Sequence, residues 1–330
     1  MIKVRILLLL ASCLALLGSC GKPKPKENTL TAAEFSADSA YTYIKQQVDF
    51  GARVPGTVAH ELCYRWLTDK LTSFGAEVHT EQGTMLNYEG REQPIVNIMA
   101  RFGHQTLANG QARKRVLLCA HYDCRPWADQ EPDYRDRFQP VMGANDGASG
   151  VGVLLEIARQ LGQMDPDKQP NIDIVLFDCE DMGTPEFYTG KQREDTWCLG
   201  SQLWAERHKS EAGNYSYGIL LDMVGAPDAV FPREYFSMNF AQQHVLRVWD
   251  IALKLGYGRY FKQEVSMPIT DDHYYLNTIA HIPCIDIIHY SSEGETGFAH
   301  YWHTTTDDMR NIARESLGAV GTTVMTAIIK

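Results

Sequence analysis

One stretch near the middle of the chain constrains the fold more than any other. It is an apolar, largely β-branched run that ends in two adjacent acids, and it reads Ile172-Asp173-Ile174-Val175-Leu176-Phe177-Asp178-Cys179-Glu180-Asp181. Such a run is typical of a buried strand in a parallel sheet, so Glu180 and Asp181 fall at its carboxyl end. In open α/β sheets, ligands bind at this end.

The adjacency of Glu180 and Asp181 suggests that they have different tasks. In an extended chain neighbouring side chains point to opposite sides, so one acid can bind a metal while the other moves a substrate proton. Taken alone, the pair is equally compatible with the start of a solvated loop.

Strands and helices alternate along most of the remaining chain. Helical spacing is found over residues 31–50, 57–74, 151–161, 199–207 and 241–255, and strand-like runs over 77–80, 94–102, 116–120, 217–222 and 283–288. This alternation predicts an α/β fold with a single doubly wound sheet, mixed but mostly parallel, and helices on both faces. Residues 124–142 and 182–196 are polar and irregular, which indicates long loops.

The first residues differ from the rest and have the order of a secretory signal. Lys3 and Arg5 precede an apolar core over residues 6–17, and Leu17-Gly18-Ser19-Cys20 resembles a bacterial lipobox. A plain cleaved signal peptide is the alternative. We expect a lipoprotein signal peptide over residues 1–19, a proline-containing tether over 20–30, and a catalytic α/β domain over 31–330. A lipid on Cys20 would anchor an exported bacterial protein in the periplasm, at the outer membrane or on the cell surface.

The charge of the chain argues against a nucleic-acid partner, and its cysteine spacing argues against a zinc–thiolate site. The formal net charge of the whole chain is -10, and removal of residues 1–19 leaves 29 basic residues against 41 acidic ones, or -12. No basic run is present, so nucleic acid is not an expected partner.

The cysteines after Cys20 form no C-x-x-C pairs, which argues against a zinc–thiolate site. Cys119, Cys179 and Cys284 lie in apolar, strand-like runs and are expected in the core, without a specific disulfide.

Polar side chains follow several of the predicted strands where each strand ends. They are His121 and Asp123, Glu180 and Asp181, Asp222, and His303 in a later loop, with Asp146 at a helix start. Each has an ordinary explanation by itself, since an Asp in Asn-Asp-Gly is usually a turn residue and a His after Trp is usually packed. Together at one sheet edge, carboxylates and imidazoles without thiolates suit a catalytic zinc with an open coordination position.

In order and approximate spacing, these residues resemble those of the zinc aminopeptidase fold. Within that clan the chain is more similar to glutaminyl cyclases, the glutaminyl-peptide cyclotransferases that convert N-terminal glutamine to pyroglutamate with loss of ammonia. The similarity rests on Leu221-Asp222-Met223-Val224-Gly225-Ala226-Pro227 with Phe231-Pro232, on Thr270-Asp271-Asp272-His273, and above all on Trp302-His303-Thr304. The aminopeptidases of the clan share the histidine but usually lack that tryptophan.

The resemblance implies a role for each matching residue. Asp146, Asp181 and His303 would hold one zinc per chain. Glu180 would be the general acid/base, and Asp222 and Asp271 would form the acid network that supports it. Trp302 would line the substrate pocket, with Phe298 as a further wall. The implied partners are peptide or protein N-termini that bear glutamine, and we expect a monomer.

Two positions depart from the pattern of the animal cyclases. The metal-binding acid after Glu180 is Asp181 rather than glutamate, and Asp286 stands where those enzymes place a histidine. Both departures concern the geometry of the acid network.

Two other functions remain open from the sequence. The first is a two-zinc aminopeptidase, in which His121 and Asp222, with a bridging Asp146, hold a second metal that activates water. The second is a non-catalytic surface lipoprotein that kept the fold as a binding module. The presence of Glu180 together with the metal-type residues disfavours this last reading.

Overall fold

The computed structural model describes residues 30–103, 113–191, 193–291 and 296–330. The expected signal peptide, and the tether apart from Leu30, lie outside the described residues.

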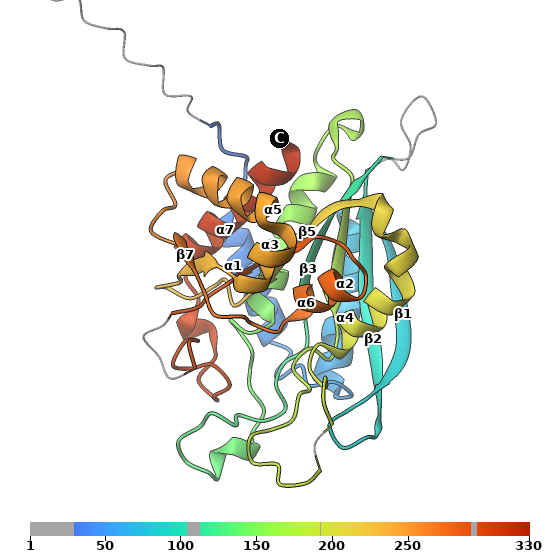
Figure 1. Cartoon of the computed structure of the whole chain (residues 1–330), viewed down its shortest axis with the longest axis vertical. Helices are drawn as coiled ribbons and strands as arrows, with labels where there is room; N and C mark the ends of the chain where they lie inside the picture. The colour runs from blue at the N-terminus through green and yellow to red at the C-terminus, as the bar shows by residue number, and fades with distance from the viewer. Residues whose placement is uncertain (1–29, 104–112, 192, 292–295) are drawn as a thin grey trace, which may run out of the picture.

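The core is a six-stranded sheet with the order β1-β2-β4-β3-β5-β8 (Figure 1). Its strands are β1 (Glu77–Leu86), β2 (Glu92–Phe102), β3 (Arg115–His121), β4 (Ile172–Phe177), β5 (Tyr215–Asp222) and β8 (Cys284–Ile288). The pairs β1/β2 and β2/β4 are antiparallel, whereas β4/β3, β3/β5 and β5/β8 are parallel. A separate small sheet pairs β6 (Phe231–Arg233) with β7 (Phe261–Val265). The expected mixed, mostly parallel sheet is therefore confirmed.

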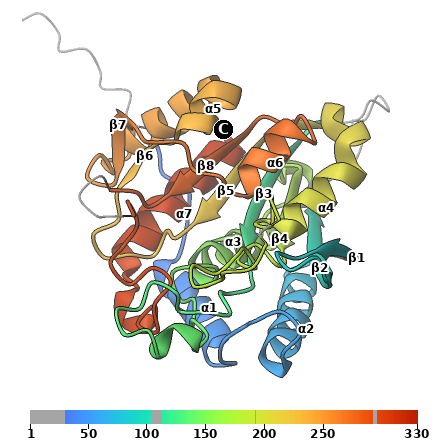
Figure 2. The same ribbon diagram turned by 60° about the horizontal axis from the view of Figure 1, so that its bottom comes forward.

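Helices cover both faces of the sheet (Figure 2). One face packs against α1 (Ala37–Val48), α2 (Val58–Ser73), α3 (Ala148–Gly162) and α7 (Arg314–Ile329). The other packs against α4 (Leu199–His208) and α6 (Asp272–Thr278). Helix α5 (Tyr235–Lys254) contacts β8 and α7 at one side of the sheet. The sequence patterns above did not predict α6, α7 or the β6/β7 sheet.

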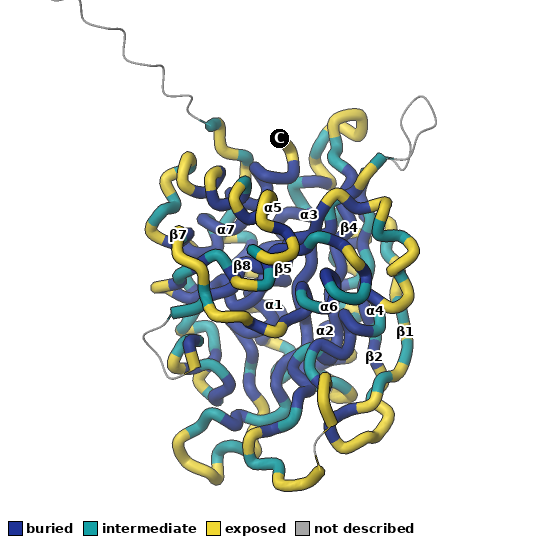
Figure 3. Tube along the Cα trace, in the orientation of Figure 1, coloured by how far each residue is buried: buried dark blue, intermediate teal, exposed yellow. Residues whose placement is uncertain are grey.

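The central strands are buried on both faces, which explains their near-continuous apolar sequences (Figure 3). In β3, Leu118 and Ala120 join the core under α1, α3 and α7, whereas Leu117 and Cys119 join the core under α4 and α6. Alternate residues of a strand point to opposite faces, so a strand covered on both sides needs apolar residues at every position. Cys119, Cys179 and Cys284 are fully buried as expected.

Two helices begin at different residues from those predicted, because capping side chains fix their starts. Helix α1 begins after Ser36, whose side chain accepts a hydrogen bond from the Ser39 N–H, and not at Thr31. Helix α5 begins after Glu234, whose carboxylate accepts the N–H groups of Phe236 and Ser237. The predicted start at Ala241 is instead a distortion within this helix (φ -138, ψ 31).

The expectation of an extended chain through Glu180 and Asp181 is wrong. Strand β4 ends at Phe177, and Cys179 has a left-handed backbone (φ 55). Asp178 stabilises this bend because its carboxylate accepts the Cys179 N–H at 2.8 Å and the Val96 N–H at 2.8 Å. Both acids therefore follow a bend after the strand, and strand alternation does not set the directions of their side chains.

The expected loops extend from the carboxyl ends of the parallel strands and lie at the bottom of Figure 1. Residues 124–142 contain a single 3₁₀ turn, Asp136–Phe138, and the described residues between 182 and 196 form neither helix nor strand. The described chain starts at the opposite end of the molecule, beside the C-terminus, where Lys330 donates to the Thr31 carbonyl. No helix within the described ranges is both long and apolar enough to cross a bilayer.

Candidate active site

All of the residues to which the resemblance to glutaminyl cyclases assigns a role line one pocket at the carboxyl end of the sheet. The cavity has a volume of about 210 Å³. Its polar wall contains Asp146, Glu180, Asp181, Asp222, Asp271 and His303, and its apolar wall contains Trp302 and Phe298 together with Trp197, Met223, Ile269 and Ile288. A pocket of this size, apolar with convergent polar groups, suits the side chain of one substrate residue.

The three proposed zinc ligands meet on one side of this pocket. Nε2 of His303 lies 3.1 Å from Oδ1 of Asp181 and 3.5 Å from Oδ2 of Asp146. Oδ2 of Asp181 is buried and has no hydrogen-bond partner within the described chain. Carboxylate and imidazole ligands converge here around an unsatisfied buried oxygen, and this donor set fits a zinc ion. Their roles as ligands stay a prediction.

Two buried aspartates hold the backbone of the ligand-bearing loops. Asp123 accepts the N–H groups of Glu180 and Asp181 at 3.1 and 3.2 Å. Asp307 accepts the N–H groups of Asn145 and Asp146 at 2.9 and 3.0 Å. Each aspartate therefore fixes two consecutive amides, and with them the direction of the adjoining metal-type carboxylate.

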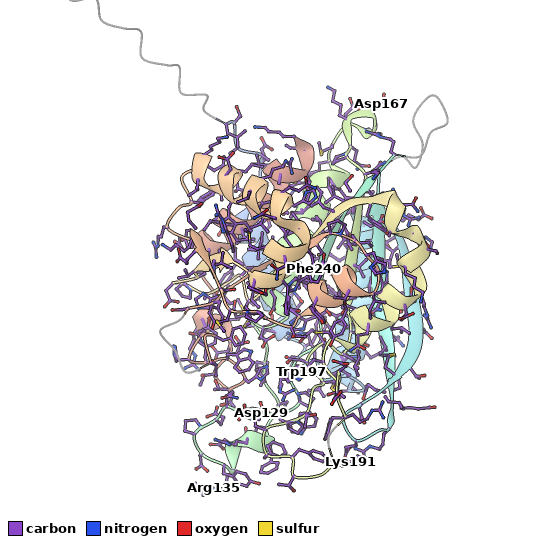
Figure 4. The ribbon with its side chains drawn as sticks, in the orientation of Figure 1. Asp129, Arg135, Asp167, Lys191, Trp197 and Phe240 are labelled. Atoms are coloured by element: carbon purple, nitrogen blue, oxygen red, sulfur yellow. The ribbon has the colours of Figure 1, made fainter. Side chains whose placement is uncertain are left out.

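His303 is enclosed by two indole rings and oriented by an acid. Its ring stacks on Trp302 with centroids 3.7 Å apart and on Trp197 at 5.9 Å. Nδ1 of His303 faces Oδ1 of Asp129 at 3.4 Å, and Asp129 is itself paired with the buried Arg125. Figure 4 shows Trp197 and Asp129 near each other, above the exposed loop tips marked by Arg135 and Lys191. This arrangement leaves Nε2 of His303 directed at Asp181 and Asp146.

The acids of the pocket raise one another's proton affinity. Burial raises the pKa of Glu180 well above its usual value, and the charges of Asp181 and Asp271 add to this effect. Burial, with the charges of Asp271 and Asp146, raises the pKa of Asp222 to about 7 although His121 opposes the shift. The raised pKa makes Glu180 a better proton acceptor than an ordinary glutamate, as a proton-shuttling acid requires.

The residues of the alternative second metal site also lie close together, although His121 does not line the pocket. Nε2 of His121 lies 3.1 Å from Oδ1 of Asp146 and 3.2 Å from Oδ1 of Asp222. Ligand atoms of His121, Asp146 and Asp181 all lie within 4.8 Å of one another. The fold thus brings both ligand sets together, with Asp146 between them.

Asp286 lies behind the pocket and does not line it. It is fully buried on β8, and neither of its carboxylate oxygens has a hydrogen-bond partner among the described residues. Oδ2 of Asp286 is 3.6 Å from Nδ1 of His273, whose Nε2 lies 2.9 Å from Glu234. Burial and the charges of Asp271 and Glu234 raise the pKa of Asp286 well above its usual value.

The sequence interpretation missed several residues that shape the site. Trp197 lines the pocket, Asp129 faces Nδ1 of His303, and Asp307 accepts the Asp146 N–H. All three lie in loops whose partners are far away in the sequence, and no local motif marks them. Asp129 lies in the predicted loop 124–142 and Trp197 directly follows the predicted loop 182–196, whereas no predicted segment contains Asp307.

The comparisons with known proteins agree with this geometry. The family model described as peptidase family M28 matches residues 97–328. Among solved structures, a Zn-dependent exopeptidase from Parabacteroides distasonis is 46% identical, with a TM-score of 0.85, and the match covers 91% of this chain and 100% of that one. A Bacteroides thetaiotaomicron glutaminyl cyclase bound to N-acetylhistamine is 45% identical, with a TM-score of 0.84, covering 91% and 99%.

A curated relative of lower identity also matches the chain. Glutaminyl-peptide cyclotransferase from Bos taurus is 24% identical over 243 residues, which are 63% of this chain and 60% of the bovine protein. The match thus spans less than two thirds of the bovine enzyme's length. These findings confirm the resemblance to glutaminyl cyclases that the motifs indicate.

Proposed function

This chain belongs to peptidase family M28, and from that membership and its pocket we infer that it is a glutaminyl-peptide cyclotransferase. It converts N-terminal glutamine of peptides or proteins to pyroglutamate and releases ammonia. Because relatives described as exopeptidases and as cyclases are equally similar to it, the pocket carries the argument.

The observation that carries this proposal is the indole of Trp302 stacked at 3.7 Å on His303, at the boundary between the apolar and acidic walls. Phe298 also packs on this indole, with ring centroids 4.8 Å apart. A flat aromatic wall beside the metal-type residues can hold a glutaminyl side chain folded back toward its own amine. Such a conformation makes the attack intramolecular and removes much of its entropic cost.

The reaction forms a bond between the α-nitrogen and the γ-amide carbon and breaks the bond from that carbon to the amide nitrogen. The carboxylate of Glu180 accepts a proton from the attacking amine and then donates it to the departing nitrogen, which leaves as ammonia. Asp222 and Asp271 lie in the same pocket, and the charge of Asp271 helps to hold this proton because it disfavours ionisation of Glu180. The apolar wall keeps competing water away from the reacting carbon.

Asp146, Asp181 and His303 would hold the zinc that the family requires. When bound there, zinc supplies the Lewis acidity that polarises the γ-amide carbonyl. We propose one zinc per chain, because an intramolecular amine attack needs no metal-activated water. Metal analysis of the purified protein tests this stoichiometry, and two zinc ions per chain would contradict it.

A peptide assay tests the function directly. A peptide with N-terminal Gln should release ammonia and lose the corresponding mass, whereas the same peptide acetylated on its α-amine should not react. Release of free glutamine without ammonia would instead identify an aminopeptidase. That second candidate function is supported by His121, which lies within 3.2 Å of both Asp146 and Asp222.

We further propose that the enzyme is a monomeric exported lipoprotein anchored through Cys20. The order of residues 1–20 supports export. The described chain also begins at the end of the molecule opposite the pocket loops, so an anchor there would leave the pocket facing away from the membrane (Figure 1). Labelling with a radioactive fatty acid should mark the wild type and not Cys20→Ala, and light scattering should give the mass of one chain.

A further inference from the structure

The proposed general acid/base has a hydrogen-bond partner to which neither the motifs nor the comparisons assign a role. The Cys198 thiol donates to Oε1 of Glu180 at 3.1 Å. No other hydrogen bond to the Glu180 side chain is found among the described residues. We propose that Cys198 is a positioning residue that holds the Glu180 carboxylate toward the substrate, an inference that rests on the cyclase function proposed above.

The backbone makes this contact rigid. The N–H of Cys198 donates to the Glu180 carbonyl at 2.8 Å, so residues 180 and 198 are joined through both main chain and side chain. Cys198 has a left-handed backbone (φ 55) at the start of α4, and Leu199 donates to the Cys179 carbonyl at 3.1 Å. A non-glycine residue rarely adopts such a backbone, which occurs where the surrounding structure enforces it.

The surroundings of the thiol suit this task. Cys198 is fully buried, and its sulfur lies within 4.8 Å of carboxylate oxygens of both Glu180 and Asp271. Burial raises the pKa of the Cys198 thiol well above its usual value, and the charge of Glu180 adds to this, so the group keeps its proton. A neutral thiol can donate to the Glu180 carboxylate and can weakly accept a hydrogen bond once Glu180 is protonated. It can therefore hold the acid in both states of the proton shuttle.

The hydrogen bond from Cys198 would restrict the conformations of the Glu180 side chain. A glutamate side chain has several rotatable bonds, and ordering it costs entropy that a fixed partner reduces. Without the thiol, the carboxylate would sample orientations that cannot reach both the attacking and the departing nitrogen. We expect this loss to reduce kcat more than substrate binding, because the substrate side chain is held by the aromatic wall.

Variants of the zinc-loaded enzyme test the proposal. Cys198→Ala should lower kcat about five- to thirty-fold, the equivalent of one hydrogen bond, with KM and zinc content unchanged. Cys198→Ser, which keeps a hydroxyl donor, should restore kcat to within about threefold of wild type. Cys63→Ala removes an equally buried thiol outside the pocket and should leave kcat unchanged. A Cys198→Ala enzyme with wild-type kcat, a change in KM alone, or a serine variant as slow as the alanine variant would overturn the proposal.

An infrared measurement provides a readout that needs no turnover. The S–H stretching band of Cys198 is the band that Cys198→Ser removes, and it should shift toward that of a free thiol in Glu180→Ala. An unshifted band would refute the hydrogen bond. If Cys198→Ala does not fold, this infrared comparison still tests the hydrogen bond between Cys198 and Glu180. Failure of wild type to cyclise Gln peptides would instead refute the proposed function, so the two failures are distinguishable.

Discussion

The carboxylate of Asp123 accepts the backbone N–H of Asp181 at 3.2 Å, and its other oxygen accepts that of Glu180 at 3.1 Å. One buried side chain at the end of β3 thus fixes the backbone of both acids that follow β4. The relationship explains how two neighbouring residues can keep fixed positions, one as the proposed metal ligand and one as the proposed proton shuttle.

Replacement of Asp123 should therefore disturb both functions at once. Asp123→Asn presents an amide NH₂ to one of the two N–H donors, so we expect a loss of about 10- to 100-fold in activity and in zinc affinity. Activity assays and zinc titration measure the two effects. Asp167→Asn, at an exposed turn at the other end of the molecule, should change neither (Figure 4).

Glu180→Gln should abolish proton transfer and leave the metal site intact. The amide keeps the size of the side chain but cannot accept and return a proton, so we expect kcat to fall by about two to four orders of magnitude. Zinc content should equal that of wild type. Loss of zinc in this variant would show that the roles of Glu180 and Asp181 are exchanged.

Asp181→Ala should lose zinc and activity together, because it removes a metal ligand. His303→Ala should behave in the same way. By contrast, His121→Ala should keep its zinc if only one site is used. Metal analysis after dialysis checks all three variants, and full zinc occupancy in Asp181→Ala would contradict the assignment.

Replacement of Trp302 should change kcat/KM for Gln peptides and leave zinc content unchanged. Trp302→Ala removes the aromatic wall, and we expect kcat/KM for Gln peptides to fall about 10- to 100-fold through lost packing and lost orientation. Trp302→Phe keeps an aromatic face and should retain more of the activity than Trp302→Ala. Zinc content should stay constant in both, and a wild-type kcat/KM in Trp302→Ala would count against the proposed pocket.

The pair His60 and Asp178 should make stability depend on pH. Burial lowers the pKa of His60, but the hydrogen bond and charge of Asp178 outweigh it and raise the pKa above its usual 6.5. Because the folded state binds this proton more tightly, the stabilisation is complete below about pH 6.5 and is lost as pH rises through the folded pKa. Urea unfolding between about pH 5.5 and 8.5 measures it.

His60→Gln should remove this part of the pH dependence. His79→Gln, which replaces an exposed histidine, should preserve it. If wild type and His60→Gln had parallel pH profiles, the pair would contribute nothing to stability.

The sequence by itself determined the class of fold and the chemical character of the site. Apolar runs such as 172–177 and 217–222 have the composition that a strand buried on both faces needs, and their polar ends mark the ligand-binding edge. Glu180, Asp181 and His303 were recognisable because carboxylates and imidazoles in that order resemble a known zinc site. Such patterns are local, or depend only on chain order.

Only the tertiary structure decided how those residues are held. Asp123 reaches Glu180 across the β3/β4 pair, Asp307 reaches Asp146 from a loop beyond β8, and Cys198 reaches Glu180 from the start of α4. These contacts join residues that lie 18 to 161 positions apart. They depend on strand order, on register and on the left-handed bend at Cys179, all of which arise from packing the whole chain. The reacting groups can therefore be identified from short sequence motifs, whereas their orientation depends on contacts that form only in the complete fold.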